Sequence, residues 1–262
     1  APTLEKIHNK YYLRFSFTET VTLSDTPIAE QIICAVDLGI NTDAVCSIMK
    51  ADGTILARKF IDFTSDKDRM IHTMNRTRRK QSKYGPKSAR GLWAYVKRLN
   101  EDRAKKISAA IVEFASQHSV DAIVMEHLNF KGCKKRGSKA QKLSMWNHGI
   151  IREKAEQKAH LLGIRIATIC AWKTSALAFD GSGSVTRDDN NHALATFTTG
   201  KQYNCDLSAS YNIGARYFIR ELLKSLPATE ESRVKAKVPD VGRRTSCTLS
   251  TLRILVKECS AA

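Results

Sequence analysis

The sequence contains seven cysteines but lacks any CxxC pair. An odd number of widely spaced cysteines disfavours a secreted disulfide scaffold and indicates free thiols in a reducing, cytoplasmic compartment. The sequence also lacks an apolar run approaching the ~18 residues that a membrane span needs, and its first residues show no signal-peptide pattern. We therefore expect no membrane partner. Because the chain begins with Ala rather than Met, we expect a fragment of a longer protein.

Positive charge is concentrated in two segments. Residues 67–106 carry 14 basic and 3 acidic side chains, and residues 131–142 carry 6 basic and no acidic ones. These segments account for the whole net charge of +17, since the remainder of the chain is neutral. Such localised charge suggests a surface for a polyanion and disfavours a small-molecule enzyme. With 42% apolar residues, the chain is long enough to bury one sizeable core, which excludes a disordered protein.

The order of the predicted elements indicates an α/β protein. Three strands on short connections predict an antiparallel meander, and later strands with continuous apolar runs are reached through helices, so they are buried on both faces. This is the outline of a ribonuclease-H-like (RuvC) fold, a mixed five-stranded sheet with helices on both faces and an inserted long basic helical hairpin. The predicted strands are 11–18, 32–36, 44–49, 55–63, 120–125 and 164–169, and the predicted helices are a hairpin over 64–118, 144–162 and 207–223.

Three carboxylates stand at the ends of predicted elements. Asp37 follows the strand 32–36, Glu126 follows the strand 120–125, and Asp206 opens the last predicted helix. Open α/β sheets place their sites at such strand ends, so the three should converge if the two strands are neighbours. Like charges in proximity raise each other's pKa, and hard cations remove that cost. Oxygen ligands suit two Mg²⁺ or Mn²⁺ ions, which at about 3.5–4 Å apart support in-line hydrolysis of a phosphodiester. We predict these three acids as catalytic and metal-binding residues.

Each carboxylate also has a simpler interpretation. Asp37 can begin a turn before Gly39, Glu126 can be a strand-end charge, and Asp206 can be a helix N-cap, the commonest role for Asp at that position. The matching pattern on two separate strands favours the shared site.

Three segments around these acids resemble the RuvC motifs of TnpB proteins, nucleases encoded by insertion sequences. They are residues 35–41 (AVDLGIN), 123–129 (IVMEHLN) and 206–213 (DLSASYNI). Order and spacing agree, and the resemblance covers about residues 4–224. It implies an RNA-guided, transposon-associated DNA endonuclease related to the type V CRISPR effectors. It further implies DNA and a guide RNA as partners, and a prokaryotic, nucleoid-associated location in the cytoplasm.

The resemblance also divides the chain. It implies the end of a wedge-like β domain plus a linker in residues 1–30, a RuvC-like nuclease domain in 31–224, and a C-terminal tail in 225–262. One departure is clear in residues 173–204, where the family carries a zinc ribbon with two CxxC pairs. Here Ala178 and Gly181 stand at the first pair and only Cys205 remains near the second. Tetrahedral thiolate coordination needs all four ligands, so we predict no structural zinc and expect residues 181–204 to act as a lid.

The basic residues of the two charged segments are predicted to flank the acidic site and to bind nucleic-acid phosphates, which positions a strand without reading its sequence. A solvated charged face is the simpler alternative for each segment. Two other functions stay open, a guide-dependent DNA-binding protein without cleavage and a RuvC-type resolvase or transposase. The predicted nucleic-acid-binding residues are Arg76, Arg78, Arg79, Lys80, Lys83, Lys87, Arg90, Lys97, Arg98, Lys131, Lys134, Lys135, Arg136 and Lys139.

Overall fold

The body of the protein is built around a mixed five-stranded sheet. Its strands are β3 (Ile32–Asp37), β4 (Ala44–Lys50), β5 (Ile55–Ile61), β6 (Ala122–His127) and β7 (Arg165–Cys170). The computed structural model describes residues 2–128, 145–188, 191, 193–243 and 245–260. The strand order of the five-stranded sheet is β5-β4-β3-β6-β7. β3, β4 and β5 pair antiparallel, whereas β6 joins β3 and β7 joins β6 in parallel. The predicted ribonuclease-H-like sheet is confirmed.

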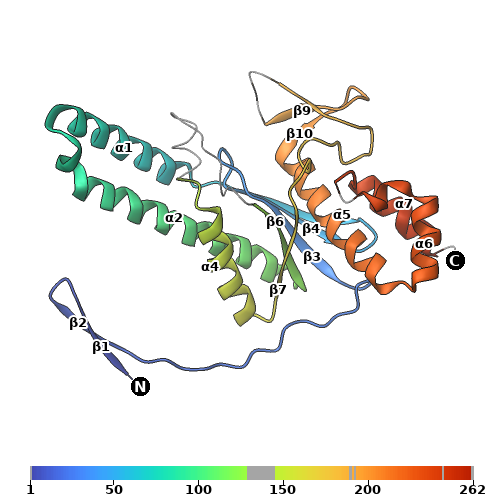
Figure 1. Ribbon diagram of the computed structural model, residues 1–262, viewed down its shortest axis with the longest axis horizontal. Coiled ribbons are helices and arrows are strands. Elements are labelled where there is room, and N and C mark those ends of the chain that lie inside the picture. The colour runs from blue at the N-terminus through green and yellow to red at the C-terminus, as the bar shows by residue number, and fades with distance from the viewer. Residues whose placement is uncertain (1, 129–144, 189–190, 192, 244, 261–262) are drawn as a thin grey trace.

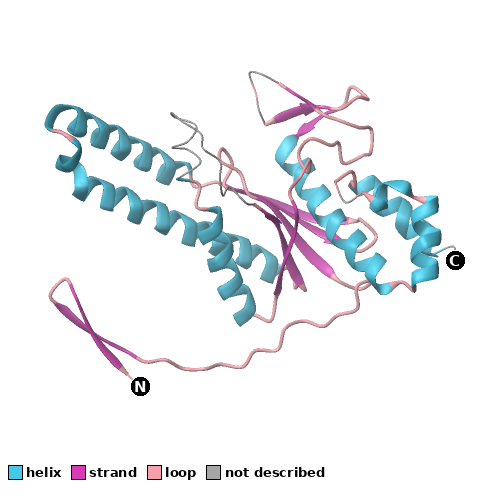
Figure 2. Ribbon diagram, viewed as in Figure 1, coloured by secondary structure: helices cyan, strands magenta, loops and turns pink. Residues whose placement is uncertain are grey.

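Helices cover both faces of this sheet (Figures 1 and 2). One face packs against α2 (Arg90–Gln117) and α4 (His148–Leu161), and the other packs against α5 (Cys205–Ser225). The alternation of side chains along a strand divides the core accordingly. Cys34 and Val36 of β3 belong to the cluster with α2 and α4, while Ile33 and Ala35 belong to the cluster with α5. All four are fully buried, so β3 is the central strand of both cores.

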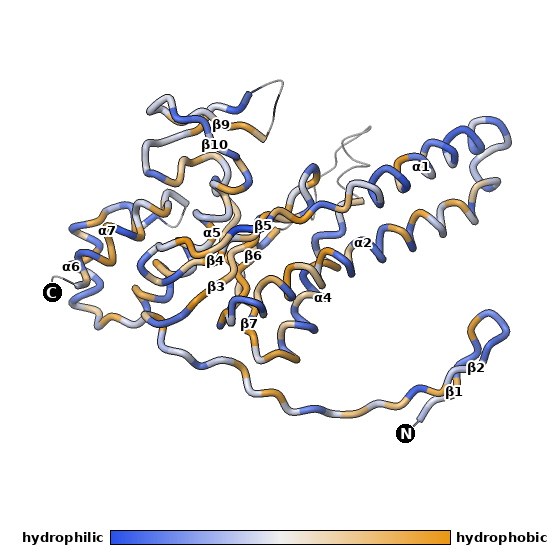
Figure 3. Tube along the Cα trace, turned by 180° about the vertical axis from the view of Figure 1, so that it is seen from behind, coloured by the Kyte–Doolittle hydropathy of each residue, from blue (hydrophilic) through white to orange (hydrophobic). Residues whose placement is uncertain are grey.

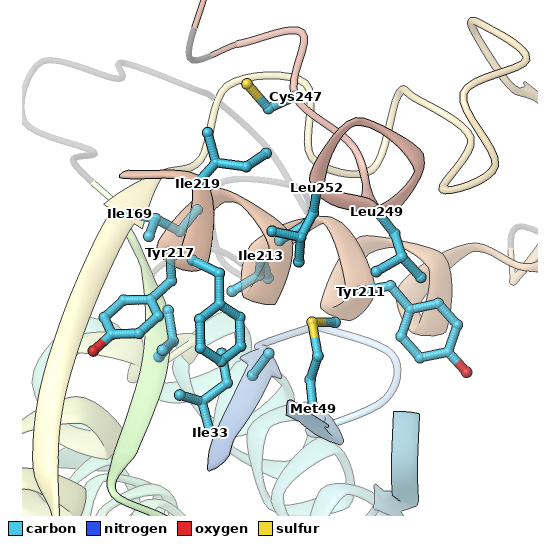
Figure 4. Packing of buried hydrophobic residues seen from close by; sticks show 14 of the residues in the cluster. Ile33, Met49, Ile169, Tyr211, Ile213, Tyr217, Ile219, Cys247, Leu249 and Leu252 are labelled. Atoms are coloured by element: carbon cyan, nitrogen blue, oxygen red, sulfur yellow. The ribbon is translucent and has the colours of Figure 1, made fainter. Parts of the chain in front are cut away.

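Helix α5 lies very close to β3 and β4. Figure 4 shows Ile213 and Tyr217 of α5 among the side chains that meet Ile33 and Met49 of the sheet. Gly214 makes the approach possible, because a Cβ at this position would lie 2.9 Å from Met49 Cε and 3.2 Å from the Ala35 Cβ. The middle of α5 is therefore held against the strand that ends at Asp37.

The predicted basic hairpin forms a long arm that projects from the body (Figures 1 and 3). It consists of α1 (Thr64–Tyr84), the short helix η1 (Pro86–Ala89) and the first half of α2. Buried Asp43 fixes its base: the Asp43 carboxylate pairs with Arg103 of α2 and with Lys67 of α1, the latter at 3.1 Å, and accepts the backbone N–H of Phe63. Both helices of the arm are thus tied to the turn between β3 and β4.

Residues 173–204, at the predicted zinc-ribbon position, contain a small three-stranded antiparallel sheet. Its strands are β8 (Thr186–Arg187), β9 (Leu194–Thr196) and β10 (Gln202–Asn204), in the order β10-β9-β8. Buried Ala178, Phe197 and Cys205 form a separate apolar cluster there. Phe179 packs edge-to-face on Phe197 and on Tyr211 of α5, with ring centroids 5.5 and 5.2 Å apart. Aromatic packing thus fastens this sheet to the body.

Both ends of the chain differ from the sequence-based expectation. The predicted strand 11–18 is instead β2 (Lys10–Arg14), which ends earlier and pairs with β1 (Thr3–Ile7) in a hairpin. His8 and Asn9 form its turn with positive φ angles, a conformation that Asn tolerates. The hairpin lies apart from the body at the end of an extended linker (Figure 1).

Beyond Pro227, where no further element was predicted, the chain continues into α6 (Ala228–Lys237) and α7 (Leu249–Ser260). Leu249, Leu252 and Leu255 of α7 are at most 1% exposed, and they belong to the α5 core. Helix α5 is therefore not the last helix of the fold, and residues 225–260 complete one of its two cores. No helix among the described residues has the length and apolarity to cross a membrane.

Candidate active site

Two of the three predicted acids lie side by side at the ends of neighbouring parallel strands. Asp37 directly follows Val36 and Glu126 directly follows Met125, and Val36 and Met125 are paired across β3 and β6. The apolar runs before the acids are buried, because both faces of these strands are covered by helices. The condition on which the predicted convergence depends, that the two strands are neighbours, is met, and the pairing brings both carboxylates to one edge of the sheet.

The third acid, Asp206, is contributed by the first turn of α5. Asn204 is the N-cap of this helix, and its side-chain oxygen accepts the backbone N–H of Leu207 at 2.9 Å. The simpler interpretation of Asp206 as the capping residue is therefore wrong, since Asn204 already satisfies that donor. Asp206 is left with its carboxylate available to the site.

The three carboxylates interact electrostatically. Burial raises the pKa of Asp37 well above its usual range, and the charges of Glu126 and Asp206 raise it further. Burial also raises the pKa of Glu126 and that of Asp206. Removal from water and mutual repulsion both disfavour the charged forms, so a cation at this place would stabilise all three.

Several side chains that sequence reasoning missed support these acids. Thr174 donates its hydroxyl to Glu126 Oε1, and a hydrogen bond from Thr42 lowers the pKa of Asp206 against the effect of burial. Arg187 of β8 is close enough for its charge to lower the pKa of both Asp37 and Asp206, and it donates to Ser175 Oγ at 2.9 Å. The small sheet therefore places one positive charge beside the acidic cluster.

Buried Arg216 of α5 organises the backbone behind Glu126. Its guanidinium donates to four backbone carbonyls at 2.7 to 3.1 Å, which belong to Cys170, Trp172, Thr245 and Cys247. Its charge also lowers the pKa of Glu126, opposing the effect of burial. This side chain joins the end of β7 to the segment that leads into α7.

Asn212, also on α5, fixes the loop that carries Thr174. Its side-chain amide donates to the carbonyls of Thr174 and Leu177, and its oxygen accepts the N–H of Leu249. All four possible hydrogen bonds of a buried Asn amide are difficult to satisfy at once, and three are made here. The third TnpB-like motif thus contributes Asp206 to the site and Asn212 to its scaffold.

The donor set fits a hard divalent cation. Oxygen-only ligands from separate elements are typical of Mg²⁺, which keeps several of its waters and so needs few direct protein ligands. Within the ranges that the structure describes, no three or more His, Cys, Asp or Glu side chains are gathered at metal-ligand spacing. Asp37, Glu126 and Asp206 are therefore near enough to couple their charges but do not form a closed cage.

The nine predicted nucleic-acid-binding residues between positions 76 and 98 are all exposed on the arm. Lys97 is paired with Glu101 at 3.8 Å, and the other eight form no ion pair with any described residue. On α1 they begin nine residues beyond Lys67, which at 1.5 Å per residue is about 14 Å further along the helix, whereas Arg98 of α2 lies only five residues from Arg103 at the base of the arm. The charge of the arm therefore extends outward from its base, which adjoins the turn between β3 and β4. Lys131, Lys134, Lys135, Arg136 and Lys139 lie outside the described residues.

Comparison with known proteins finds similarity at the level of structure alone. No protein-family model matches the sequence, and no curated protein matches it. Among solved structures, the chain is similar to Cas12f1 in a complex with sgRNA and target DNA, with a TM-score of 0.53 and 18% identity over 80% of this chain and 54% of that chain. A Cas12f ternary complex gives a TM-score of 0.51 at 17% identity, covering 78% of this chain and 41% of that one.

A third structure, the AacC2c1–sgRNA binary complex, matches with a TM-score of 0.52 at 10% identity over 72% of this chain and 39% of that chain. The chain thus spans only about two fifths to one half of the length of these proteins. At such identities the similarity concerns the fold, and it agrees with the resemblance of the three acidic segments to TnpB. The chain has the ribonuclease-H-like fold that is found in these type V CRISPR effectors.

Proposed function

We propose that the chain is the metal-dependent DNA endonuclease domain of a TnpB-like, RNA-guided, transposon-associated protein. The observation that carries this proposal is the convergence of three carboxylates at the paired ends of β3 and β6 and in the first turn of α5, where burial and mutual repulsion raise the pKa of Asp37. A protein keeps such a costly cluster where a bound cation relieves it. The fold shared with the type V effectors is consistent with this assignment.

In the proposed reaction, Asp37, Glu126 and Asp206 would hold two Mg²⁺ or Mn²⁺ ions. Such ions would supply an activated water and stabilisation of the leaving oxygen of a phosphodiester. The protein's contribution is orientation: Thr174 fixes the Glu126 carboxylate, and Thr42 fixes that of Asp206. Arg187 adds a positive charge for the phosphate that approaches the cluster.

DNA and a guide RNA are the proposed partners. The solved complexes of Cas12f1 and AacC2c1 contain sgRNA, and the former also contains target DNA. The exposed cations of the arm, eight of them without an ionic partner among the described residues, would bind the backbone of a duplex that leaves the site. We propose the basic residues Lys131, Lys134, Lys135, Arg136 and Lys139 for the same role on the basis of the sequence alone.

Cleavage of labelled DNA by the purified chain in Mg²⁺ or Mn²⁺ tests the proposal. Asp37→Ala should reduce the cleavage rate by about 10³-fold, as expected for the loss of several kcal/mol of transition-state stabilisation. DNA affinity should persist, because the arm is intact. Asp68→Ala is the matched control: Asp68 is exposed on α1, makes no ion pair among the described residues, and its loss changes the net charge equally.

Undiminished cleavage by Asp37→Ala would contradict the assignment of a nuclease site.

Calorimetric titration with Mn²⁺ distinguishes a nuclease from a protein that binds DNA without cleaving it. An active site should bind Mn²⁺ in a manner that Asp37→Ala and Glu126→Ala abolish, whereas a binding-only protein should give no such signal. Comparison of branched and linear DNA substrates distinguishes a resolvase, which would prefer the branched form.

A further inference from the structure

A polar pocket adjoins the acidic cluster that Asp37, Glu126 and Asp206 form. It has a volume of about 310 Å³ and lies between the ends of β3 and β6 and the first two turns of α4. Leu38 and Met125 are among its apolar lining residues, while Glu126, His127, His148 and Arg152 supply polar groups. Glu126 belongs to both the pocket and the cluster. A ligand in the pocket would therefore be a direct neighbour of a group bound by the three acids.

Arg152 gives this pocket its character. It is half-buried, yet no described residue forms an ion pair or hydrogen bond with its guanidinium. Two arginines of the body are, in contrast, held by partners: Arg103 by Asp43, and Arg220 by Glu221 and the Thr168 carbonyl. A half-buried guanidinium that is paired with no described side chain keeps its donors available for an anion that a ligand supplies.

We propose that this pocket binds a phosphate of the nucleic-acid strand next to the one that is cut, with Arg152 as its anchor. The inference rests on the proposed nuclease function, because it assigns the pocket to the same strand. The five N–H donors of a guanidinium match the oxygens of a phosphate, whereas Glu126 repels an uncompensated anion. The phosphate is therefore drawn toward Arg152 and away from Glu126, which leaves the cluster to the scissile group. Contacts of this kind set the register of a strand without reading its bases.

The salt dependence of binding tests the proposal independently of cleavage. The probe is a fluorescein-labelled single-stranded DNA of about 20 nucleotides, longer than the ~4–16 nucleotides that one single-strand-binding fold covers. Affinity is measured by fluorescence anisotropy at several salt concentrations in the Asp37→Ala background, so that the DNA probe is not cleaved during the measurement. Adding Arg152→Ala should weaken binding about tenfold and lower the slope of log K against log salt by about 0.7, the value of one single-strand phosphate contact.

Two further variants sharpen the result. Lys158→Ala removes the same charge from an exposed position of α4 and should change neither affinity nor slope. Arg152→Lys keeps the charge and should restore the slope, but with lower affinity because an ammonium cannot bind a phosphate through two parallel donors. Thermal unfolding of each variant verifies that the fold is retained. An unchanged slope in folded Arg152→Ala, or an equal loss in Lys158→Ala, would overturn the proposal.

A second readout uses the reaction. In the wild-type chain, a neutral methylphosphonate placed one linkage from a preferred cut should suppress that cut about tenfold, while Arg152→Ala should be indifferent to it. Equal suppression in both would refute the assignment of Arg152. If the chain cuts no DNA at all, the proposed function fails, and the salt dependence still decides whether Arg152 holds a phosphate.

Discussion

Arg216 should be the most sensitive single position for stability, because its guanidinium satisfies four backbone carbonyls from two separate segments. Hydrogen bonds to a charged group contribute about 1.5–3 kcal/mol each. Burial of the charge offsets part of this gain, as the lowered pKa of Arg216 indicates. For Arg216→Met, which keeps much of the volume, we expect a net loss of about 3–5 kcal/mol, because buried carbonyls left without a donor cost about 1–3 kcal/mol each and the relief of burying the charge offsets part of that cost.

Such a loss is a large fraction of the ~5–15 kcal/mol that stabilises a typical protein. Urea unfolding followed by circular dichroism would measure it, and the thermal midpoint should fall by about 10 °C. Arg220→Met is the control, because Arg220 donates to a single backbone carbonyl, that of Thr168, and otherwise pairs with the adjacent Glu221. Its loss should cost about 1 kcal/mol. A cost below about 1 kcal/mol for Arg216→Met, or equal costs for both variants, would refute the reasoning.

Two further predictions concern the packing and the charge of the site. Gly214→Ala should lower the free energy of unfolding in urea by about 1 kcal/mol, because overpacking against Met49 and Ala35 outweighs the better helix propensity of Ala. A gain in stability would contradict the close approach of α5 to the sheet. Asp37→Asn should raise the thermal midpoint of the metal-free protein at pH 7. Because the pKa of Asp37 is raised in the folded state, its stability contribution is present below the unfolded-state pKa and is lost as pH rises through the folded-state pKa. The advantage of the Asn variant over the wild type should therefore vanish near pH 3. An advantage that persists at that pH would contradict its electrostatic origin.

The central part of the fold was predictable because its signals are local. Runs of apolar residues that end in Asp37 and Glu126 require strands buried on both faces, and the connections between them leave few possible topologies. The pairing of β3 with β6 was a condition of the prediction, and the structure satisfies it.

The supporting side chains were not predictable from the sequence. Arg187 is one basic residue in an aperiodic segment, and its position beside Asp37 arises only after the small sheet packs on α5. Thr174 and Arg216 act through contacts between segments distant in the chain. Helix α7 did leave a signal in its leucines at positions 249, 252 and 255, but a helix of 12 residues after a mixed-composition stretch is difficult to recognise.

The apolar cluster of the small sheet has a practical consequence for experiments on metal dependence. In proteins whose zinc ribbon shapes the active site, a chelator removes the structural ion together with the catalytic ones, and unfolding is then mistaken for a chemical requirement. Here the sheet that carries Arg187 is held by Phe179, Phe197 and Tyr211. A chelator should therefore act on the carboxylates alone, so that activity and folding respond to metal separately and reversibly.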